Sequence, residues 1–132
     1  MRQTQQQRRA AHALAWVQAR LIDGSIDNKA LKSAANDLPA LILMNGLGQA
    51  AAYCQGKDTP EHKALYGLLS EWLCGEGSVY HGQPNLLAGI TAGDMHHYRL
   101  AQAEALAYLP WVKRFARAFI EDEQTTAAGA ES

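Results

Sequence analysis

Histidine is the side chain in this sequence with the widest possible chemistry, because imidazole both binds metals and transfers protons near neutral pH. A structural zinc site takes four ligands, usually supplied as tight local pairs. The closest two histidines here are adjacent, and adjacent residues of a helix point ~100° apart. We therefore predict no metal site and no cofactor, and we expect these side chains to be solvated or at the edge of the core: His12, His62, His81, His96 and His97.

Asp94 lies close enough in sequence to His96 and His97 to suggest an acid–base pair for RNA cleavage. Such a pair needs a cleft and a reacting group within hydrogen-bond reach, and the sequence indicates neither. We therefore predict no catalytic residue, no small-molecule substrate and no enzyme activity. A small histidine-dependent ribonuclease stays open as an alternative.

Basic side chains suggest contact with nucleic acid. Lys113 and Arg117 lie one helical turn apart, with Arg114 beside them. Arginine and lysine bind phosphates without reading a sequence, and an exposed tryptophan stacks on a base. A second group with these properties shares one side of the first predicted helix: Arg9, Trp16 and Arg20. The alternative is a solvated charged surface, with Trp16 at the edge of the core.

The segment from Asn45 to Gln49 contains a G-x-G motif, Gly46 and Gly48, that is found in dinucleotide-binding loops. No predicted strand precedes it and no third glycine follows at the required spacing, so the dinucleotide interpretation fails. Two glycines in a helix cost ~1 kcal/mol each but let another backbone approach closely. Close approach of a phosphate backbone is a further possibility.

Composition and charge are those of one small domain of 132 residues. The net charge of −1 hides an asymmetry, because residues 121–132 carry Glu121, Asp122, Glu123 and Glu131 and no base. The first 120 residues hold all 12 basic groups and nine of the 13 acidic ones, a balance of +3.

No apolar run approaches the ~20 residues of a membrane span. The N-terminus resembles no secretory signal, so we expect no membrane partner and a cytoplasmic location.

Helical periodicity runs through most of the chain, and no stretch alternates as a strand does. The predicted helices cover residues 4–22, 27–36, 39–53, 61–74, 86–91 and 95–122. Gly24 can end the first of them in a left-handed conformation. The hydroxyl of Thr59, with Pro60 after it, can begin the fourth, and Asp94 can cap the last.

Prolines and one apolar run predict how these helices are arranged. Pro39 marks the first turn of the third helix. Residues 41–44 are apolar on every side, as in a central helix that is covered all round. Pro110 should kink or split the last helix, since an interior proline costs ~3 kcal/mol. We therefore predict an all-α fold, a compact bundle of five to six helices around a central apolar helix within residues 38–53. Residues 1–123 form its single domain, and 124–132 are expected to be a disordered acidic tail.

A family resemblance rests on residues that run in order from about residue 8 to 120. An arginine run precedes Ala10-Ala11, and the pairing of the Asn45–Gln49 segment with the Trp111–Ala116 segment is fairly specific. The full set is Leu38-Pro39, Asn45-Gly46-Leu47-Gly48-Gln49-Ala50, Tyr53, His62-Lys63, Leu65-Tyr66, Leu69, Trp72-Leu73, Ile90, Asp94, Tyr98-Arg99, Ala101, Glu104-Ala105-Leu106, Tyr108-Leu109 and Trp111-Val112-Lys113-Arg114-Phe115-Ala116. With these residues the chain resembles the small (fifth) subunit family of the Cmr complex, the type III-B CRISPR effector that targets RNA.

This resemblance implies an all-helical, non-catalytic subunit that takes part in antiviral defence. Copies of it would stack along one side of the ribonucleoprotein, against other Cmr subunits, and help to hold target RNA on the guide RNA. Cleavage would belong to other subunits. The residues expected to contact RNA phosphates are Lys113, Arg114 and Arg117, with Arg20 and Lys57 as further candidates.

A free-standing DNA-binding regulator is the other alternative. It needs a helix-turn-helix whose second helix carries base-reading side chains. The predicted helix 61–74 is the only plausible reader, and it is poor in arginine, asparagine and glutamine.

Overall fold

The computed structural model describes residues 3–120, which fold into six helices without any strand in that range. The all-α prediction is therefore confirmed. The tail predicted at residues 124–132 lies outside the described residues. The helices are α1 (Gln5–Asp23), α2 (Asn28–Asn45), α3 (Leu47–Gly56), α4 (Pro60–Leu73), α5 (Leu86–Ala92) and α6 (Met95–Phe119).

Helix ends follow the local sequence closely. The Thr4 hydroxyl accepts the Gln7 amide while the Gln7 side chain accepts the Thr4 amide, a capping box that begins α1. Gly24 ends that helix at φ 68°, in the predicted left-handed conformation. Asp94 caps α6 by accepting the His97 amide at 2.8 Å, also as predicted. Pro60 begins α4 as expected, but the Thr59 hydroxyl pairs with His62 Nδ1 at 2.7 Å and caps no amide.

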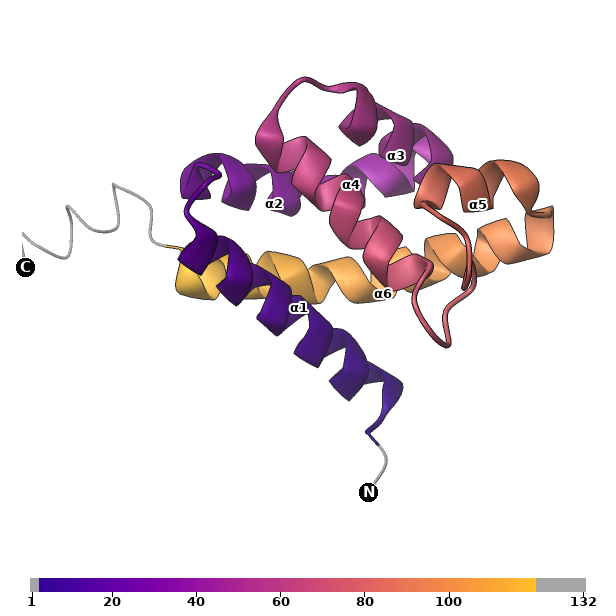
Figure 1. Cartoon of the computed structure of the whole chain (residues 1–132), viewed down its shortest axis with the longest axis horizontal. Coiled ribbons are helices and arrows are strands. Elements are labelled where there is room, and N and C mark those ends of the chain that lie inside the picture. Colours follow the sequence, from indigo (N-terminus) through magenta and orange to yellow (C-terminus); the bar gives the residue numbers. More distant parts are fainter. Residues whose placement is uncertain (1–2, 121–132) are drawn as a thin grey trace, which may run out of the picture.

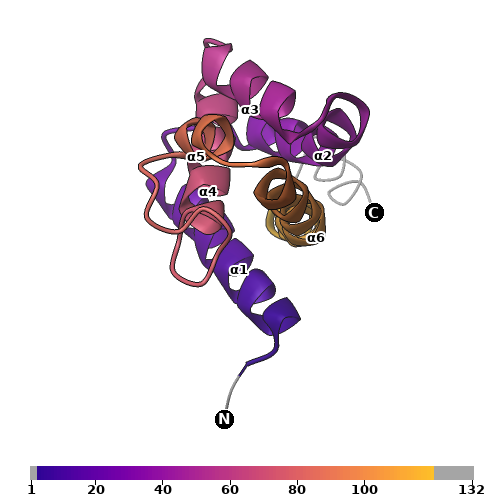
Figure 2. The same cartoon turned by 90° about the vertical axis from the view of Figure 1, so that its right-hand side faces the viewer.

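The central helix is α6, and the prediction that placed it within residues 38–53 is wrong. Its most extensive contacts are with α1 and α2, which lie on different sides of it in the two views (Figures 1 and 2). Six side chains along it are buried: Ala101, Ala105, Tyr108, Leu109, Val112 and Ala116. Pro110 neither ends nor splits the helix. Burial of the neighbouring Leu109 and Val112 offsets the ~3 kcal/mol that an interior proline costs.

Pro39 does not begin a helix, and the chain is divided at Gly46 instead. Leu38 and Ile42 are buried on either side of Pro39, so α2 continues through it. Gly46 adopts φ 87°, which no helix accommodates, and α3 starts directly after it. The apolar run is correspondingly not covered: Leu43 and Met44 are 73% and 81% exposed.

The two glycines of the G-x-G motif bring α3 against α6. The amides of Leu47 and Gly48 donate to Gln102 Oε1 and Tyr98 Oη, each at 2.9 Å. A Cβ on Gly46 would lie 3.0 Å from Tyr98 Oη. The sequence predicted that the two glycines let another backbone approach the helix closely. A close approach does occur, but the group that approaches is the phenol side chain of Tyr98 and not a backbone. Two of the α3 amides that lack partners within their own helix are satisfied in this way.

Two glycines, one in α4 and one in α5, differ in the space around them. This difference predicts that substituting alanine at the two positions has opposite effects on stability. A Cβ on Gly89 would lie 2.6 Å from Tyr80 Cγ, whereas one on Gly67 meets nothing within 4 Å. We expect Gly89→Ala to destabilise the fold by about 1–3 kcal/mol through overpacking. Gly67→Ala should stabilise it by up to about 1 kcal/mol through helix propensity. Urea unfolding followed by circular dichroism measures both, and equal effects would contradict the packing of Tyr80 on α5.

Candidate nucleic-acid interface

Two neighbouring hollows lie where α2 runs beside the C-terminal half of α6. The larger one, the Tyr53 hollow, has a volume of about 770 Å³ and is lined by Tyr53, Lys57 and Lys113, among other residues from α2, α3, α4 and α6. The smaller one, the Arg117 hollow, has a volume of about 420 Å³. Its lining is Lys29, Lys32, Ser33, Asn36 and Arg117. Ser33 and Asn36 line both, so the two hollows form one continuous surface, hereafter the groove.

Helix direction explains why these cations meet. Lys113 and Arg117 are one turn apart and therefore share a side of α6. Helix α2 runs antiparallel to α6, so that its end at Gly46 lies near Tyr98 while its first turns lie near Arg117 (Figure 1). Lys29 and Lys32, in those first turns, consequently lie beside Arg117.

The groove carries more positive than negative charge. Within the described part of the chain, five cations line it, against two carboxylates, Asp37 and Glu61, both in the Tyr53 hollow. Lys57 Nζ donates to Tyr53 Oη at 2.8 Å, and this hydrogen bond raises the pKa of Lys57. Burial lowers the pKa of His62, and the nearby Lys57 charge lowers it further. His62 is therefore neutral at pH 7, and the positive charge comes from the lysines and Arg117.

Only three of the five predicted RNA-binding residues line the groove. These are Lys57, Lys113 and Arg117. Arg114 lines a separate hollow of about 270 Å³, together with Gln6 and Trp111. Arg20 lies over the Trp16 ring at 5.6 Å from its centroid, and Trp16 packs at the edge of the core. For Arg20 and Arg114, RNA contact stays a prediction of the sequence alone.

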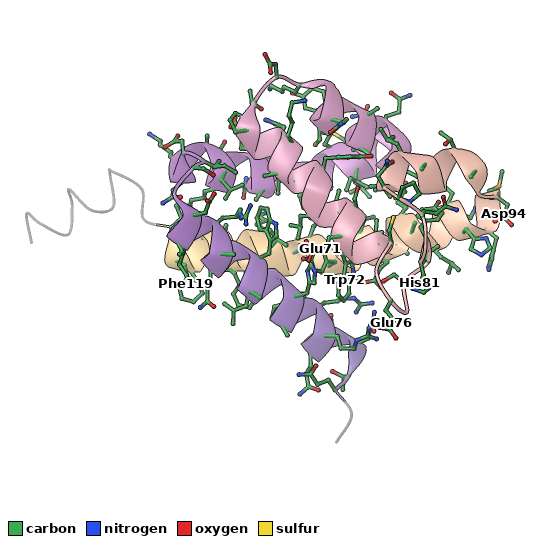
Figure 3. The ribbon with its side chains drawn as sticks, in the orientation of Figure 1. Glu71, Trp72, Glu76, His81, Asp94 and Phe119 are labelled. Atoms are coloured by element: carbon green, nitrogen blue, oxygen red, sulfur yellow. The ribbon has the colours of Figure 1, made fainter. Side chains whose placement is uncertain are left out.

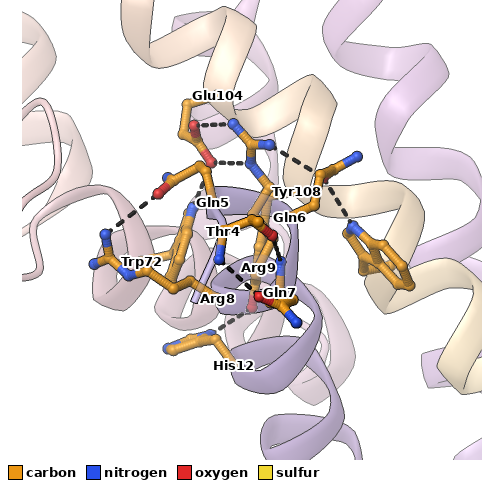
Figure 4. Close-up of polar contacts among 11 residues, drawn as sticks. Thr4, Gln5, Gln6, Gln7, Arg8, Arg9, His12, Trp72, Glu104 and Tyr108 are labelled. Atoms are coloured by element: carbon orange, nitrogen blue, oxygen red, sulfur yellow. Dashed lines mark hydrogen bonds and ion pairs between the residues drawn. The ribbon is translucent and has the colours of Figure 1, made fainter. Parts of the chain in front are cut away.

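Arg9 is partly buried in an ion pair rather than displayed on a phosphate-binding surface. Its Nε and Nη2 donate to Glu104 Oε2 and Oε1 at 2.7 and 2.8 Å, and both side chains are only 16% exposed (Figure 4). Trp72 Nε1 donates to Glu104 Oε2 at 2.9 Å. Beside this pair, His12 Nδ1 lies 2.6 Å from Tyr108 Oη. Arg9 therefore joins α1 to α6 and is not available to RNA.

Asp94 and His97 do form a close pair, since His97 Nδ1 lies 2.7 Å from an Asp94 carboxylate oxygen. Both side chains are about half exposed or more, and the same carboxylate caps the helix. The pair lies at the opposite end of α6 from Phe119 (Figure 3) and lines none of the three hollows above.

Among residues 3–120, no group of three or more His, Cys, Asp or Glu is placed to hold a metal ion. Within the same range, no helix combines the length and apolarity needed to cross a membrane.

Comparison with known proteins assigns the chain to a family. The family described as CRISPR-associated protein (Cas_Cmr5) matches residues 5–119, which is nearly the whole described fold. The chain belongs to the Cmr5 family. A relative from Thermus thermophilus, named CRISPR system Cmr subunit Cmr5, is 33% identical over 85 residues, which is 64% of this chain and 70% of that protein. The predicted resemblance is confirmed, and family membership supports a role as the small subunit of a Cmr complex.

Sequence reasoning about this Cmr5-family chain missed Lys29, Lys32 and Tyr53 as groove residues. No local signal connects the two lysines with Arg117, some 85 residues later in the chain. The spacing of Tyr53 and Lys57, which are four residues apart, is a signal that the sequence offers for that pair.

The Arg9–Glu104 pair predicts how acid affects stability. Burial alone would raise the pKa of Glu104, but hydrogen bonds from Arg9 and Trp72 outweigh it and hold that pKa below its ordinary value of 4.5. A carboxyl with a lowered folded-state pKa stabilises the fold above its unfolded pKa, and this contribution is lost as pH falls through the folded pKa. We expect Glu104→Gln to cost about 1–3 kcal/mol at pH 7. It should also flatten the loss of stability between about pH 5 and pH 3.

Urea unfolding over that pH range provides the measurement, and Glu76→Gln, at an exposed carboxylate of the same type, is the control. If both variants kept the wild-type acid dependence, Glu104 would not be the group responsible.

Proposed function

We propose that this chain is the non-catalytic small subunit of a type III-B CRISPR (Cmr) ribonucleoprotein and that its groove holds RNA by the phosphate backbone. Membership of the Cmr5 family supports the assembly. The convergence of cations from α2, α6 and the segment before α4 into one groove supports the RNA contact. Such contacts do not read a sequence. Specificity then comes from pairing of guide and target RNA, as it does in another CRISPR effector.

The proposed protein partners are other Cmr subunits and further copies of this chain, stacked along the complex in the cytoplasm. Leu43 and Met44 support such contacts, because they expose adjacent apolar side chains on α2. Apolar surface of this kind is typical of protein interfaces. Met44 also lines the Tyr53 hollow, so a protein contact at Leu43 would lie next to bound RNA.

The alternative of a DNA-binding regulator has little support in α4, its candidate reading helix. Most of that helix is buried, including Leu65, Leu69 and Trp72. Its exposed positions include Lys63, Gly67 and Glu71, which offer few donors and acceptors for base edges.

Charge removal in the groove tests the RNA contact. We expect Lys113→Gln and Arg117→Gln each to weaken binding of the isolated chain to single-stranded RNA by about 5-fold near 0.1 M salt. Each should also reduce the slope of log affinity against log salt by about 0.7, since one phosphate contact is lost. Fluorescence anisotropy with labelled RNA over a salt series gives both quantities.

The matched control is Arg99→Gln, an exposed arginine of the same helix four turns towards its N-terminal end. It should leave the affinity and the salt slope unchanged. Equal loss in all three variants would indicate a diffuse effect of net charge and contradict binding in the groove.

Isolation from the native host tests the assembly. A tagged copy of the full chain should co-purify with guide RNA and other Cmr subunits. The mass of the purified complex, measured by native mass spectrometry, gives the number of copies of this chain in each complex. Recovery solely as a free monomer would contradict the proposal. Cleavage of RNA by the isolated chain in the presence of a chelator, lost in His97→Ala, would overturn its non-catalytic part.

A further inference from the structure

The two hollows of the groove differ in chemistry. Among residues 3–120, the Arg117 hollow is lined by three cations and two small polar residues and by no carboxylate. The Tyr53 hollow combines an aromatic ring and apolar side chains such as Leu41 and Met44 with two cations, Lys57 and Lys113, and two carboxylates, Asp37 and Glu61. The first hollow attracts phosphates, whereas in the second the charges of two cations and two carboxylates offset each other. A flat ring with polar edges suits the second hollow much better than a phosphate does.

Tyr53 presents a partly exposed aromatic ring to this hollow, with Lys57 Nζ 5.2 Å from the ring centroid. It is 46% exposed although it lies in a hollow. Its orientation is held from two sides, by the hydrogen bond from Lys57 Nζ at 2.8 Å and by the edge-on contact with His62, whose ring centroid lies 5.7 Å away. A ring that is already oriented loses little conformational entropy when a ligand stacks on it. Stacking on aromatic side chains is how proteins hold single-stranded bases without reading their identity.

The volume of the Tyr53 hollow and its position in the groove agree with binding of a flat ring. The volume of about 770 Å³ is within the range of sites that enclose small organic molecules. Lys113 lines this hollow, and Arg117, one turn further along α6, lines the other. A strand whose backbone follows the cations of α6 and α2 therefore passes the mouth of the Tyr53 hollow.

We propose that the Tyr53 hollow takes an unpaired nucleobase of the bound RNA, stacked on Tyr53, while the neighbouring phosphates lie on Lys113 and in the Arg117 hollow. This inference rests on the proposed RNA contact and deepens it. It assigns to this subunit a contact with a base, which backbone binding alone does not include. The contact favours an unpaired nucleotide, because a base within a duplex must first lose its pairing and stacking energy to enter the hollow.

The test compares two ligands that share a backbone. The full chain is titrated with a short single-stranded RNA of about 12 nucleotides and with an abasic ribose–phosphate strand of equal length. We expect Tyr53→Leu to weaken binding of the RNA by at least about 5-fold. The same variant should change the affinity for the abasic strand by less than about 2-fold. Tyr53→Phe, which keeps the ring but loses the hydrogen bond from Lys57, should retain most of the affinity for RNA. Arg117→Gln should weaken both ligands equally.

Phe119→Leu is the matched control, because Phe119 is an aromatic residue of similar exposure, 48%, that does not line the groove. It should change neither affinity. Circular dichroism of each variant establishes that it is folded. As a second measurement, RNA carrying 5-iodouridine should crosslink to the peptide that contains Tyr53 upon irradiation.

The outcomes separate this inference from the proposed function. If Tyr53→Leu affects both strands equally or neither, or if the crosslink maps only elsewhere, the base site is overturned while the phosphate contacts stand. If the wild-type chain binds neither strand, the RNA-binding groove itself is overturned. If Tyr53→Leu leaves RNA binding intact but weakens assembly with the other subunits, the hollow receives a protein side chain and the base site is also overturned.

Discussion

Helix α6 packs between α1 and α2, and the alanines along its buried face set how closely those helices approach. Ala105 is buried, and Glu104 beside it accepts hydrogen bonds from Arg9 on α1 and Trp72 on α4. Three helices are therefore held at one point by a carboxylate whose partners are largely shielded from water. Removing one partner of such a pair leaves the other poorly solvated, so the arrangement of these helices is strongly specified.

The position of the groove follows from that packing. With α6 fixed against α1, its side that carries Lys113 and Arg117 faces the antiparallel α2. The first turns of α2 then bring Lys29 and Lys32 to the hollow that Arg117 lines. Like charges that gather on one surface repel each other, and this unfavourable term is relieved when a polyanion binds. Structural packing and the proposed RNA contact thus depend on the same helix.

Charge is also separated along the chain. The described body holds an excess of cations, whereas residues 121–132 hold four of the 13 acidic groups. Glu104 forms an ion pair with Arg9, and Asp94 caps the N-terminus of α6. A net charge near zero therefore says little about the surface that a nucleic acid meets. Among the described residues, the carboxylates that line the groove, Asp37 and Glu61, lie in the Tyr53 hollow.

Local rules predicted α1, α4, α5 and most of α6, because helical periodicity and end-capping act within one or two turns. They failed between residues 36 and 47. The rule that proline begins helices was applied to Pro39, but burial of Leu38 and Ile42 in the tertiary structure outweighs the cost of an interior proline. The break at Gly46 depends on Tyr98 and Gln102, which cap α3 from a distant helix and leave no trace in the local sequence.

The sequence by itself determined the all-helical class and the side of α6 that carries Lys113 and Arg117, because these depend on spacing within a single helix. The tertiary structure alone decided which cations act together. It brought Lys29 and Lys32 to Arg117, placed Arg114 in another hollow, and turned Arg9 inward to Glu104. The physical reason is that a groove between helices belongs to their packing, and packing pairs residues that no local pattern connects.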